Sequence, residues 1–324
     1  MIKTNESDTT EIPKSLSMQD KSTKIPYSLK NDYLFIALMN SHQYTLKMLI
    51  CSLLGMQMTD IVSLEIQNPI KVGEVIESKT FILDVHVLLN HNVCIDIELQ
   101  VVDYKNWPER SLGYLCRTYD NLNKGMDYIE TKPAIHVSIL DYTLFAEYPE
   151  FFAEYRMQNV KNHHDYTGKF KLYVLDLSKV DLATDADKAN HLDVWTRIFQ
   201  AKTWGDLMAV AAQYQSFEPT IEEIERLQAD ERVRLQCEAR ERSMIHERVT
   251  KELLAKQAAQ LQEQAVQMKE QAVQLETKDV QLEEQAAQLQ EQAVQMKEQA
   301  VQLGEKDAQI EQLKAQLALL TGNP

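Results

Sequence analysis

The sequence has little glycine, proline or cysteine, and it has no long apolar run. Only eight glycines and eight prolines occur in 324 residues, and none of the glycines form a loop that could cradle a phosphate. The four cysteines stand singly, without the paired spacing of disulfides or zinc sites, which favours a reduced, cytoplasmic setting. No run reaches the roughly 18 uncharged apolar residues of a membrane span. The polar start does not resemble a secretory signal, so we expect no membrane partner.

Positive charge is also scarce in this chain. It has 34 Lys and Arg against 49 Asp and Glu, a formal net charge of -15. An acidic chain is a poor non-specific binder of nucleic acid, so any DNA contact must come from a local basic face or a bound cation. The apolar content of 44% is too high for disorder throughout.

Composition and periodicity divide the chain into four parts. We expect a disordered lead-in over residues 1–28, an α/β domain over 29–188, a helical extension over 189–218 and a long helix over 219–320.

Within the α/β domain, the apolar spacing alternates between that of helices and that of strands. Helical spacing occupies residues 32–39, 41–54 and 109–124. Strand-like runs occupy residues 61–70, 80–89, 93–102, 134–140 and 170–177. Residues 145–155 form an aromatic-rich excursion between the last two runs. A mixed sheet with helices on its faces suits this order.

A heptad repeat dominates the C-terminal part. Leu, Met or Ile recurs every seven residues from Leu261 to Leu317, and alanine usually precedes it by three positions. The pattern is typical of a coiled coil, about 90 Å long if fully helical. Residues 260–275 are repeated verbatim as 288–303. We expect a homo-oligomer joined through residues 257–317; the alternative is a lone, partly frayed helix of low complexity.

Two strand-like runs separated by Asn90, His91 and Asn92 predict a β-hairpin. If the hairpin turns about His91, Asp84 lies directly opposite Glu98. The odd-numbered positions then form one apolar face. The other face collects the polar side chains of Asp84, His86, Cys94, Asp96, Glu98 and Gln100.

The carboxylates on this second face need an explanation. Acidic residues are unfavourable in strands, and like charges placed opposite each other repel. Asp84 and Glu98 persist most easily around a cation, and oxygen ligands favour Mg²⁺ or Mn²⁺ over zinc. The alternative is an acidic sheet face exposed to solvent. Ile82 and Leu88 on the same face favour partial cover, where unpaired carboxylates cost more.

Four segments, in order, carry a resemblance to a known family. They are the opening KNDYLFIALM at residues 30–39, the hairpin residues 83–85 and 97–100, the helix from Arg110 to Gly125 with the following 126–128, and residues 132–135. In these segments the chain, over residues 28–180, resembles the Rpn family of bacterial recombination-promoting, transposase-like nucleases in the PD-(D/E)XK superfamily. The resemblance implies a PD-(D/E)XK nuclease-like domain over residues 29–188, with a mixed sheet flanked by helices, that cuts DNA with a metal ion.

Matched position by position, the resemblance implies roles for four residues. Asp84 corresponds to the metal-binding Asp of the second core strand, and Glu98 to the acidic residue of the third. Asp32 corresponds to the acidic residue of the opening motif, and Gln100 stands where the superfamily usually has Lys. Asp84 and Glu98 would hold Mg²⁺ or Mn²⁺, which makes a bound water more acidic. Gln100 could orient that water but cannot act as a base.

Two positions lack a positive charge that related nucleases carry. Gln100 stands where the superfamily usually has Lys, although Gln is normal in this family, and Ile36 stands where the family's opening motif usually has Lys. Contacts to the DNA backbone could come instead from one stripe of the helix over residues 109–124. The stripe consists of Arg110, Tyr114, Arg117 and Lys124. A solvated helix face is the alternative for these residues.

We therefore predict a Mg²⁺-dependent DNA endonuclease of the recombination-promoting type, multimerised by a C-terminal coiled coil. The alternative is an oligomeric interaction protein whose nuclease-like head has lost activity, which the acidic charge and the missing lysine favour. His136 is expected to be a strand residue rather than a metal ligand.

Overall fold

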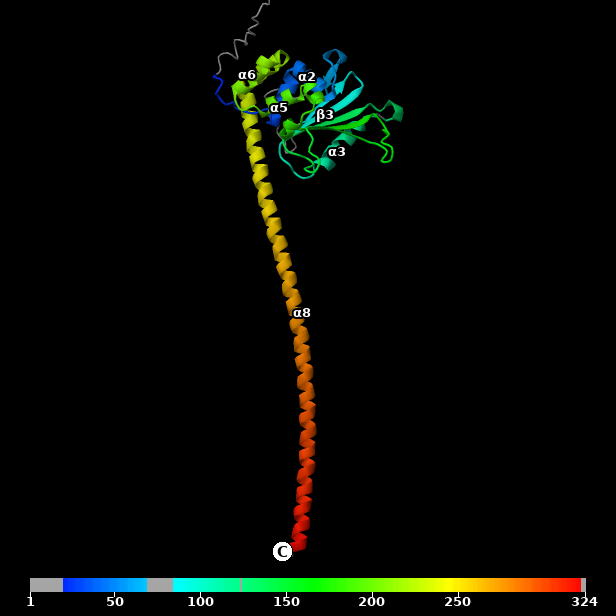
Figure 1. Cartoon of the computed structure of the whole chain (residues 1–324), viewed down its shortest axis with the longest axis vertical. Coiled ribbons are helices and arrows are strands. Elements are labelled where there is room, and N and C mark those ends of the chain that lie inside the picture. The colour runs from blue at the N-terminus through cyan, green and yellow to red at the C-terminus, as the bar shows by residue number, and fades with distance from the viewer. Residues whose placement is uncertain (1–19, 69–83, 123, 322–324) are drawn as a thin grey trace, which may run out of the picture. The chain divides into compact units, whose positions relative to one another are not determined.

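A computed structural model describes residues 20–68, 84–122 and 124–321. The chain forms two compact units, which meet between Arg248 and Val249. The first unit contains a sheet and its covering helices (Figure 1). The expected strand residues 69–70 and 80–83 lie outside the described residues.

Six strands form one mixed sheet among the described residues of the first unit, in the order β1-β2-β3-β4-β6-β5. The strands are β1 (Leu64–Ile66), β2 (Asp84–Leu89), β3 (Val93–Gln100), β4 (Ala134–Leu140), β5 (Phe152–Arg156) and β6 (Phe170–Asp176). The β3–β4 and β4–β6 pairs are parallel, and the other pairs are antiparallel. This confirms the mixed sheet expected from the sequence.

The hairpin of β2 and β3 has the register predicted from its turn. Asp84 pairs with Glu98, and Leu89 pairs with Val93. Asn90 and His91 take positive φ angles of 49° and 56° at the turn, a backbone region that Asn and His adopt more readily than most residues.

Helices cover both faces of the sheet. They are α1 (Asp32–Ser41), α2 (Gln43–Leu54), α3 (Trp107–Tyr119), α4 (Asp185–Ala189), α5 (Leu192–Gln200), α6 (Trp204–Gln213) and α7 (Glu218–Ala229). Short 3₁₀ turns are η2 (Met58–Asp60), η3 (Tyr128–Glu130), η4 (Leu177–Leu182) and η5 (Gln215–Phe217).

The two faces of the hairpin meet different helices. Most of the odd-numbered residues, such as Val85 and Ile97, are buried in the larger core with residues of α1, α2 and α5. On the other face, Trp107 of α3 packs against Leu140 and Val174 in a smaller cluster. Figure 1 shows α3 across the sheet from α2 and α5. The polar face of the hairpin therefore lies on the side of α3.

Several elements differ from the sequence analysis. The aromatic-rich excursion contains the edge strand β5. Helix α3 ends at Tyr119 rather than near residue 124. The side chain of Asn121 donates to the carbonyl groups of Thr118 and Lys132 at 3.1 Å each, and such local side-chain bonds compete with helix continuation.

The long helix expected over residues 219–320 is interrupted once. Helix α7 ends at Ala229, and Asp230 has extended backbone angles. The Asp230 side chain accepts a hydrogen bond from the backbone N–H of Arg232 at 2.8 Å, as an N-cap residue does. Helix α8 then runs from Glu231 to Thr321.

The expected lead-in has defined partners where it is described. Lys24 forms a β-bridge with Thr203, and the backbone N–H of Ile25 donates to the carbonyl of Lys202 at 3.0 Å. The Ser28 hydroxyl donates to the carbonyl of Phe199 at 2.9 Å. Residues 20–28 therefore pack on the first unit.

The described part of the second unit consists of helix α8. Every residue from 252 to 317 is exposed, including the heptad residues Leu261 and Leu317 at 66% and 65%. The expected long helix is thus present, and its pairing with another copy stays a prediction. Among the described helices, none combines the length and the apolar character that a membrane crossing requires.

Candidate active site

A cavity of about 900 Å³ opens on the polar face of the hairpin. Its walls come from β2, β3, α1, α3 and the beginning of α8, together with the segment after β3. The charged and polar residues that line it include Asp32, Asp84, His86, Glu98, Gln100, Tyr104, Arg110, Tyr114, Arg117, Lys132, Arg240 and Glu247.

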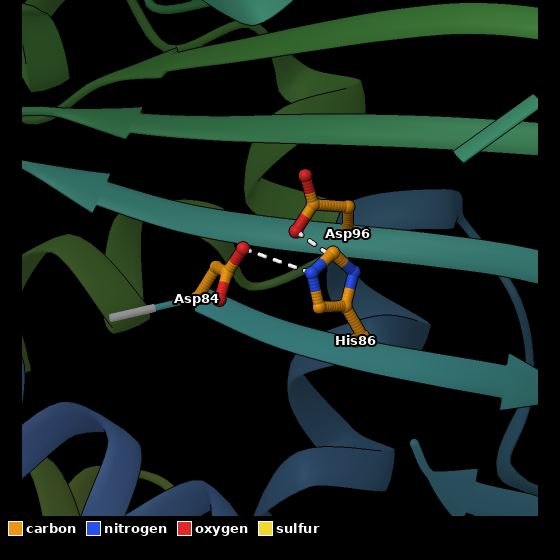
Figure 2. A group of neighbouring side chains, drawn as sticks. All are labelled: Asp84, His86 and Asp96. Atoms are coloured by element: carbon orange, nitrogen blue, oxygen red, sulfur yellow. Dashed lines mark ion pairs between the residues drawn. The ribbon is translucent and has the colours of Figure 1, made fainter. Parts of the chain in front are cut away.

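Three side chains of the hairpin form a compact group beside this cavity (Figure 2). One ligand atom each from Asp84, His86 and Asp96 lies within 4.8 Å of the other two. His86 Nε2 lies 2.9 Å from Asp84 Oδ2, and His86 Nδ1 lies 3.4 Å from Asp96 Oδ1. The hydrogen bond to Asp84 raises the pKa of His86 above its usual value, although burial opposes it.

The buried His136 of β4 holds Asp96 from behind. It pairs with Asp96 in the parallel register of β3 and β4, and its Nδ1 lies 2.8 Å from Asp96 Oδ2. Both side chains are wholly inaccessible to solvent. The ring of Tyr114 stacks on His136 with centroids 5.9 Å apart. His136 is thus a strand residue that fixes the orientation of Asp96.

Glu98 lies opposite Asp84 and is paired with α3. Arg110 Nη2 donates to Glu98 Oε1 at 2.6 Å, while Glu98 Oε2 has no hydrogen bond to any described residue. The pKa of Glu98 is raised to about 8, chiefly by burial; Arg110 opposes the rise, and Asp96 and Asp84 contribute to it. The side chain is 7% exposed. Glu98 is therefore a buried carboxyl beside two others.

The polar face of the hairpin is not an open acidic surface. Asp96, Glu98 and Asp84 are 0%, 5% and 9% exposed. Arg110 of helix α3 covers Glu98, and the partial cover expected for this face is present at all three residues. The alternative of a solvent-exposed face is wrong for these three residues.

The predicted stripe on α3 is only partly at the cavity. Arg110, Tyr114 and Arg117 line it, but Lys124 is exposed and lies beyond the end of α3, away from the lining. The guanidinium carbons of Arg110 and Arg117 lie 5.4 Å and 5.7 Å from the Tyr114 ring centroid, a cation–π distance. Lys132 adds another positive charge to the lining.

Gln100 lies at the cavity, two residues from Glu98 on the same face. Its side-chain amide donates to the backbone carbonyl of Val102 at 2.8 Å. The carbonyl oxygen of the same amide remains an acceptor, since only the nitrogen is used in this bond.

Asp32 is engaged by a residue that is far away in the sequence. Arg240 of α8 contacts both carboxylate oxygens of Asp32, and Arg240 Nη1 lies 3.4 Å from Glu247 Oε1. The Tyr104 hydroxyl donates to Glu247 Oε2 at 2.6 Å. Burial raises the pKa of Asp32 despite Arg240. Asp32 lines the cavity but lies outside the group of Asp84, His86 and Asp96.

Two parts of this site were missed from the sequence. The first is the group of Asp84, His86 and Asp96. The pairing rule that places Asp84 opposite Glu98 also places His86 opposite Asp96, so the sequence was sufficient to predict this group. Arg240 could not be predicted, because its partner Asp32 is 208 positions away and Arg240 itself belongs to no motif identified in the sequence.

Comparisons with known proteins agree with this geometry. A family model described as "PD-(D/E)XK nuclease family transposase" matches residues 29–253. The match extends beyond residue 180, where the resemblance had been placed, and includes the beginning of α8. No curated protein and no solved structure matches the chain.

Proposed function

We propose that this chain, which belongs to the PD-(D/E)XK nuclease family transposases, is a divalent-cation-dependent DNA endonuclease. Membership makes it a nuclease-like protein; the cation and the DNA substrate are the proposal. The observation that carries it is the position of Asp84 directly opposite Glu98, with both residues lining a cavity of about 900 Å³.

The unsatisfied oxygens of the buried carboxylates support a bound cation. Asp96 Oδ1 and Glu98 Oε2 are buried and have no hydrogen bond to any described residue. Burying a carboxylate oxygen that makes no hydrogen bond is costly, and a cation bound to these oxygens would remove that cost. We assign Asp84 and Glu98 as ligands of Mg²⁺ or Mn²⁺. When bound, such an ion would make a coordinated water more acidic and would stabilise charge on the phosphate.

The positive side chains of the cavity support a DNA substrate. Arg110, Arg117 and Lys132 line one region of it, and a phosphodiester backbone needs such donors on an otherwise acidic chain. Tyr114 positions both arginines, since its hydroxyl accepts from Arg110 Nε at 3.1 Å and its ring faces both guanidinium groups. Gln100 would orient the attacking water through its free carbonyl oxygen.

A second candidate function is an interaction protein with an inactive head. One observation favours it: the side-chain amide of Gln100 is bonded to the backbone of its own segment, at Val102, where related nucleases would present a lysine ammonium group. The same assay separates this candidate from the nuclease.

Cleavage of a supercoiled plasmid tests the proposal. Wild-type protein is expected to nick the plasmid in Mg²⁺ or Mn²⁺ and to be inactive in EDTA. Asp84→Asn and Glu98→Gln are each expected to lower the rate by at least about 100-fold, because each removes a ligand charge. Asp181→Asn, an exposed aspartate outside the cavity, is the matched control. Equal rates for Asp84→Asn and wild type, or no cutting by wild type, would favour the interaction protein.

We also propose that the head is multimerised through residues 257–317 and that the protein works in the cytoplasm. The exposed row of heptad residues on α8 supports the first statement, because an apolar row of this length is usually covered by another helix. Four cysteines without disulfides support the second.

A further inference from the structure

We infer that His86 is a direct ligand of the bound cation, so that the site is a mixed nitrogen and oxygen site which binds Mn²⁺ or Co²⁺ more tightly than Mg²⁺. The inference rests on the proposed function for the presence of a cation. It adds a ligand outside the predicted pair of Asp84 and Glu98, and a class of ion.

The first argument is the position of His86 between two carboxylates. Its strand partner is Asp96, and Asp84 is two residues earlier on the same face of β2. Figure 2 shows the imidazole ring between the two carboxyl groups, with an ion pair drawn to each. Three such ligand atoms within 4.8 Å of one another can converge on one ion after small side-chain rotations, since ligand distances are about 2.0–2.2 Å.

The second argument is a buried carboxylate oxygen that faces His86 and accepts no hydrogen bond from any described residue. Asp96 is fully buried, and His136 engages only its Oδ2, at 2.8 Å. The other oxygen, Oδ1, makes no hydrogen bond to any described residue and lies 3.4 Å from His86 Nδ1. Outer hydrogen bonds of this kind orient a ligand and leave its free atom for the metal. His136 therefore acts as a positioning residue for Asp96.

The third argument is access from the cavity. His86 and Asp84 both line it, and the His86 side chain is 35% exposed. An ion that enters from solvent therefore meets these two side chains before it reaches Asp96. A histidine that served only to fill the core would be as buried as His136.

The donor set decides the class of ion. Mg²⁺ is bound almost entirely through oxygen, and it keeps several waters. Imidazole nitrogen is a better ligand for later divalent ions, whose affinity for such sites rises from Mn²⁺ to Co²⁺ and beyond. Two carboxylates and one imidazole therefore favour Mn²⁺ or Co²⁺ over Mg²⁺.

A rival explanation uses the same distances. His86 could be a protonated counter-ion that neutralises Asp84 and Asp96 in place of a metal. The two explanations make opposite predictions, because removing a competing cation would strengthen metal binding, whereas removing a ligand would weaken it.

Binding of Mn²⁺ to the full chain at pH 8 tests the inference without measuring activity. Pulsed electron paramagnetic resonance of bound Mn²⁺ is expected to show coupling to a histidine ¹⁴N nucleus. His86→Asn is expected to abolish the coupling and to raise the Mn²⁺ dissociation constant at least about 10-fold, with a change of less than about 3-fold for Mg²⁺. His91→Asn, in the turn of the same hairpin and away from the cavity, is the matched control and should keep the coupling.

His86→Ala is a second variant, and thermal unfolding of each variant in EDTA shows whether it is folded. Bound Mn²⁺ without nitrogen coupling in the wild type overturns the inference, as does equal or tighter Mn²⁺ binding by His86→Asn and His86→Ala. Failure of the two proposals is distinguishable. Plasmid cleavage that depends on Asp84 but shows no nitrogen coupling refutes the role of His86 alone, and nitrogen coupling without cleavage refutes the nuclease alone.

Discussion

Arg240 Nε lies 2.8 Å and 2.7 Å from the two carboxylate oxygens of Asp32, although the residues are 208 positions apart. Their side chains are 14% and 8% exposed. One wall of the cavity is therefore tied to the beginning of helix α8. This pair places a residue of the opening helix α1 and a residue of the last helix at the same site.

Arg240→Ala is expected to destabilise the protein by about 3 kcal/mol, because breaking a buried ion pair leaves an uncompensated carboxylate. The free energy of unfolding in urea measures the loss. Arg242→Ala is the matched control, since Arg242 is on the same helix but its side chain is 73% exposed.

The double variant Asp32→Asn with Arg240→Ala should recover part of that loss, because no buried charge is then left alone. If the double variant is as unstable as the sum of the two single variants, Asp32 and Arg240 are not coupled, and the expectation is wrong.

Truncation is expected to show that the first turns of α8 belong to the head. A chain that ends at residue 253 should unfold cooperatively, whereas one that ends at residue 230 should not fold. The shorter chain loses the fully buried Val233 and Cys237, and it also loses the carbonyl of Cys237 that accepts from Asn31 at 3.0 Å. Burial of two such side chains contributes about 3 kcal/mol or more. Circular dichroism and thermal unfolding measure whether each chain is folded. Equal stability of the two chains would show that the first turns of α8 are not needed for the first unit to fold.

Stability in EDTA is expected to fall as the pH rises from about 4.5 to about 8, through Glu98. Its pKa is raised from 4.5 to about 8 in the folded state, so over this range the folded protein keeps a proton that the unfolded chain has lost. Folding then binds protons, and the free energy of unfolding decreases with pH. Below this range both states are protonated, and above it the loss is complete.

Glu98→Gln should lack this contribution. Between pH 5 and pH 9, the free energy of unfolding of the wild type is expected to fall by roughly 2 kcal/mol relative to that of the variant. This is less than the full pKa shift of Glu98 would give, because solvent screens a side chain that is not completely buried. Urea unfolding at several pH values measures the difference, and a difference that stays constant with pH would show that Glu98 titrates near its ordinary value.

DNA binding is expected to depend on Arg117 and not on Lys124. In an Asp84→Asn background, Arg117→Ala should weaken binding of a short duplex and reduce the slope of log affinity against log salt by about 1, as loss of one phosphate contact does. Lys124→Ala is the control, because Lys124 lies outside the cavity lining. Fluorescence anisotropy at several salt concentrations measures both. Equal slopes for the two variants would remove Arg117 from the DNA contact.

Self-association is expected to depend on the heptad row of α8. Leu282→Lys with Leu289→Lys should convert an oligomer into a monomer, because each leucine contributes about 2 kcal/mol when it is buried between helices. Both side chains are more than 60% exposed in the single chain. Gln281→Lys with Gln288→Lys adds the same charge one position away and is the control. Sedimentation equilibrium reads the mass, and a monomeric wild type would contradict the prediction.

The hairpin shows what local sequence could determine. Three turn residues around His91 set the register, and side-chain alternation then placed Asp84 and Glu98 on the same face, as the structure confirms. The same alternation identified the buried apolar face with Val85 and Ile97. Register and facing are local properties, so a single sequence suffices to predict them.

The rest of the site depends on contacts between distant segments. Arg240 contacts Asp32 because the beginning of α8 packs beside α1. The hydrophobic periodicity of a helix shows which face is buried, but it does not show which distant segment covers that face. The edge strand β5 was missed because it has only five residues, FAEYR, whose apolar and polar side chains do not alternate as in a half-buried strand. The helix break at Asp230 does have a local signal, because an aspartate at this position can cap the next helix. The sequence has no proline between Pro219 and Pro324, and for that reason one uninterrupted helix was expected.

The verbatim repeat in α8 has a consequence for the length of this helix. Residues 260–275 recur 28 positions later, which corresponds to four whole heptads. Removing or adding one 28-residue unit would leave the row from Leu261 to Leu317 in phase. The length of helix α8 can thus change in steps of four heptads, about 42 Å each, without any adjustment among the residues that line the cavity.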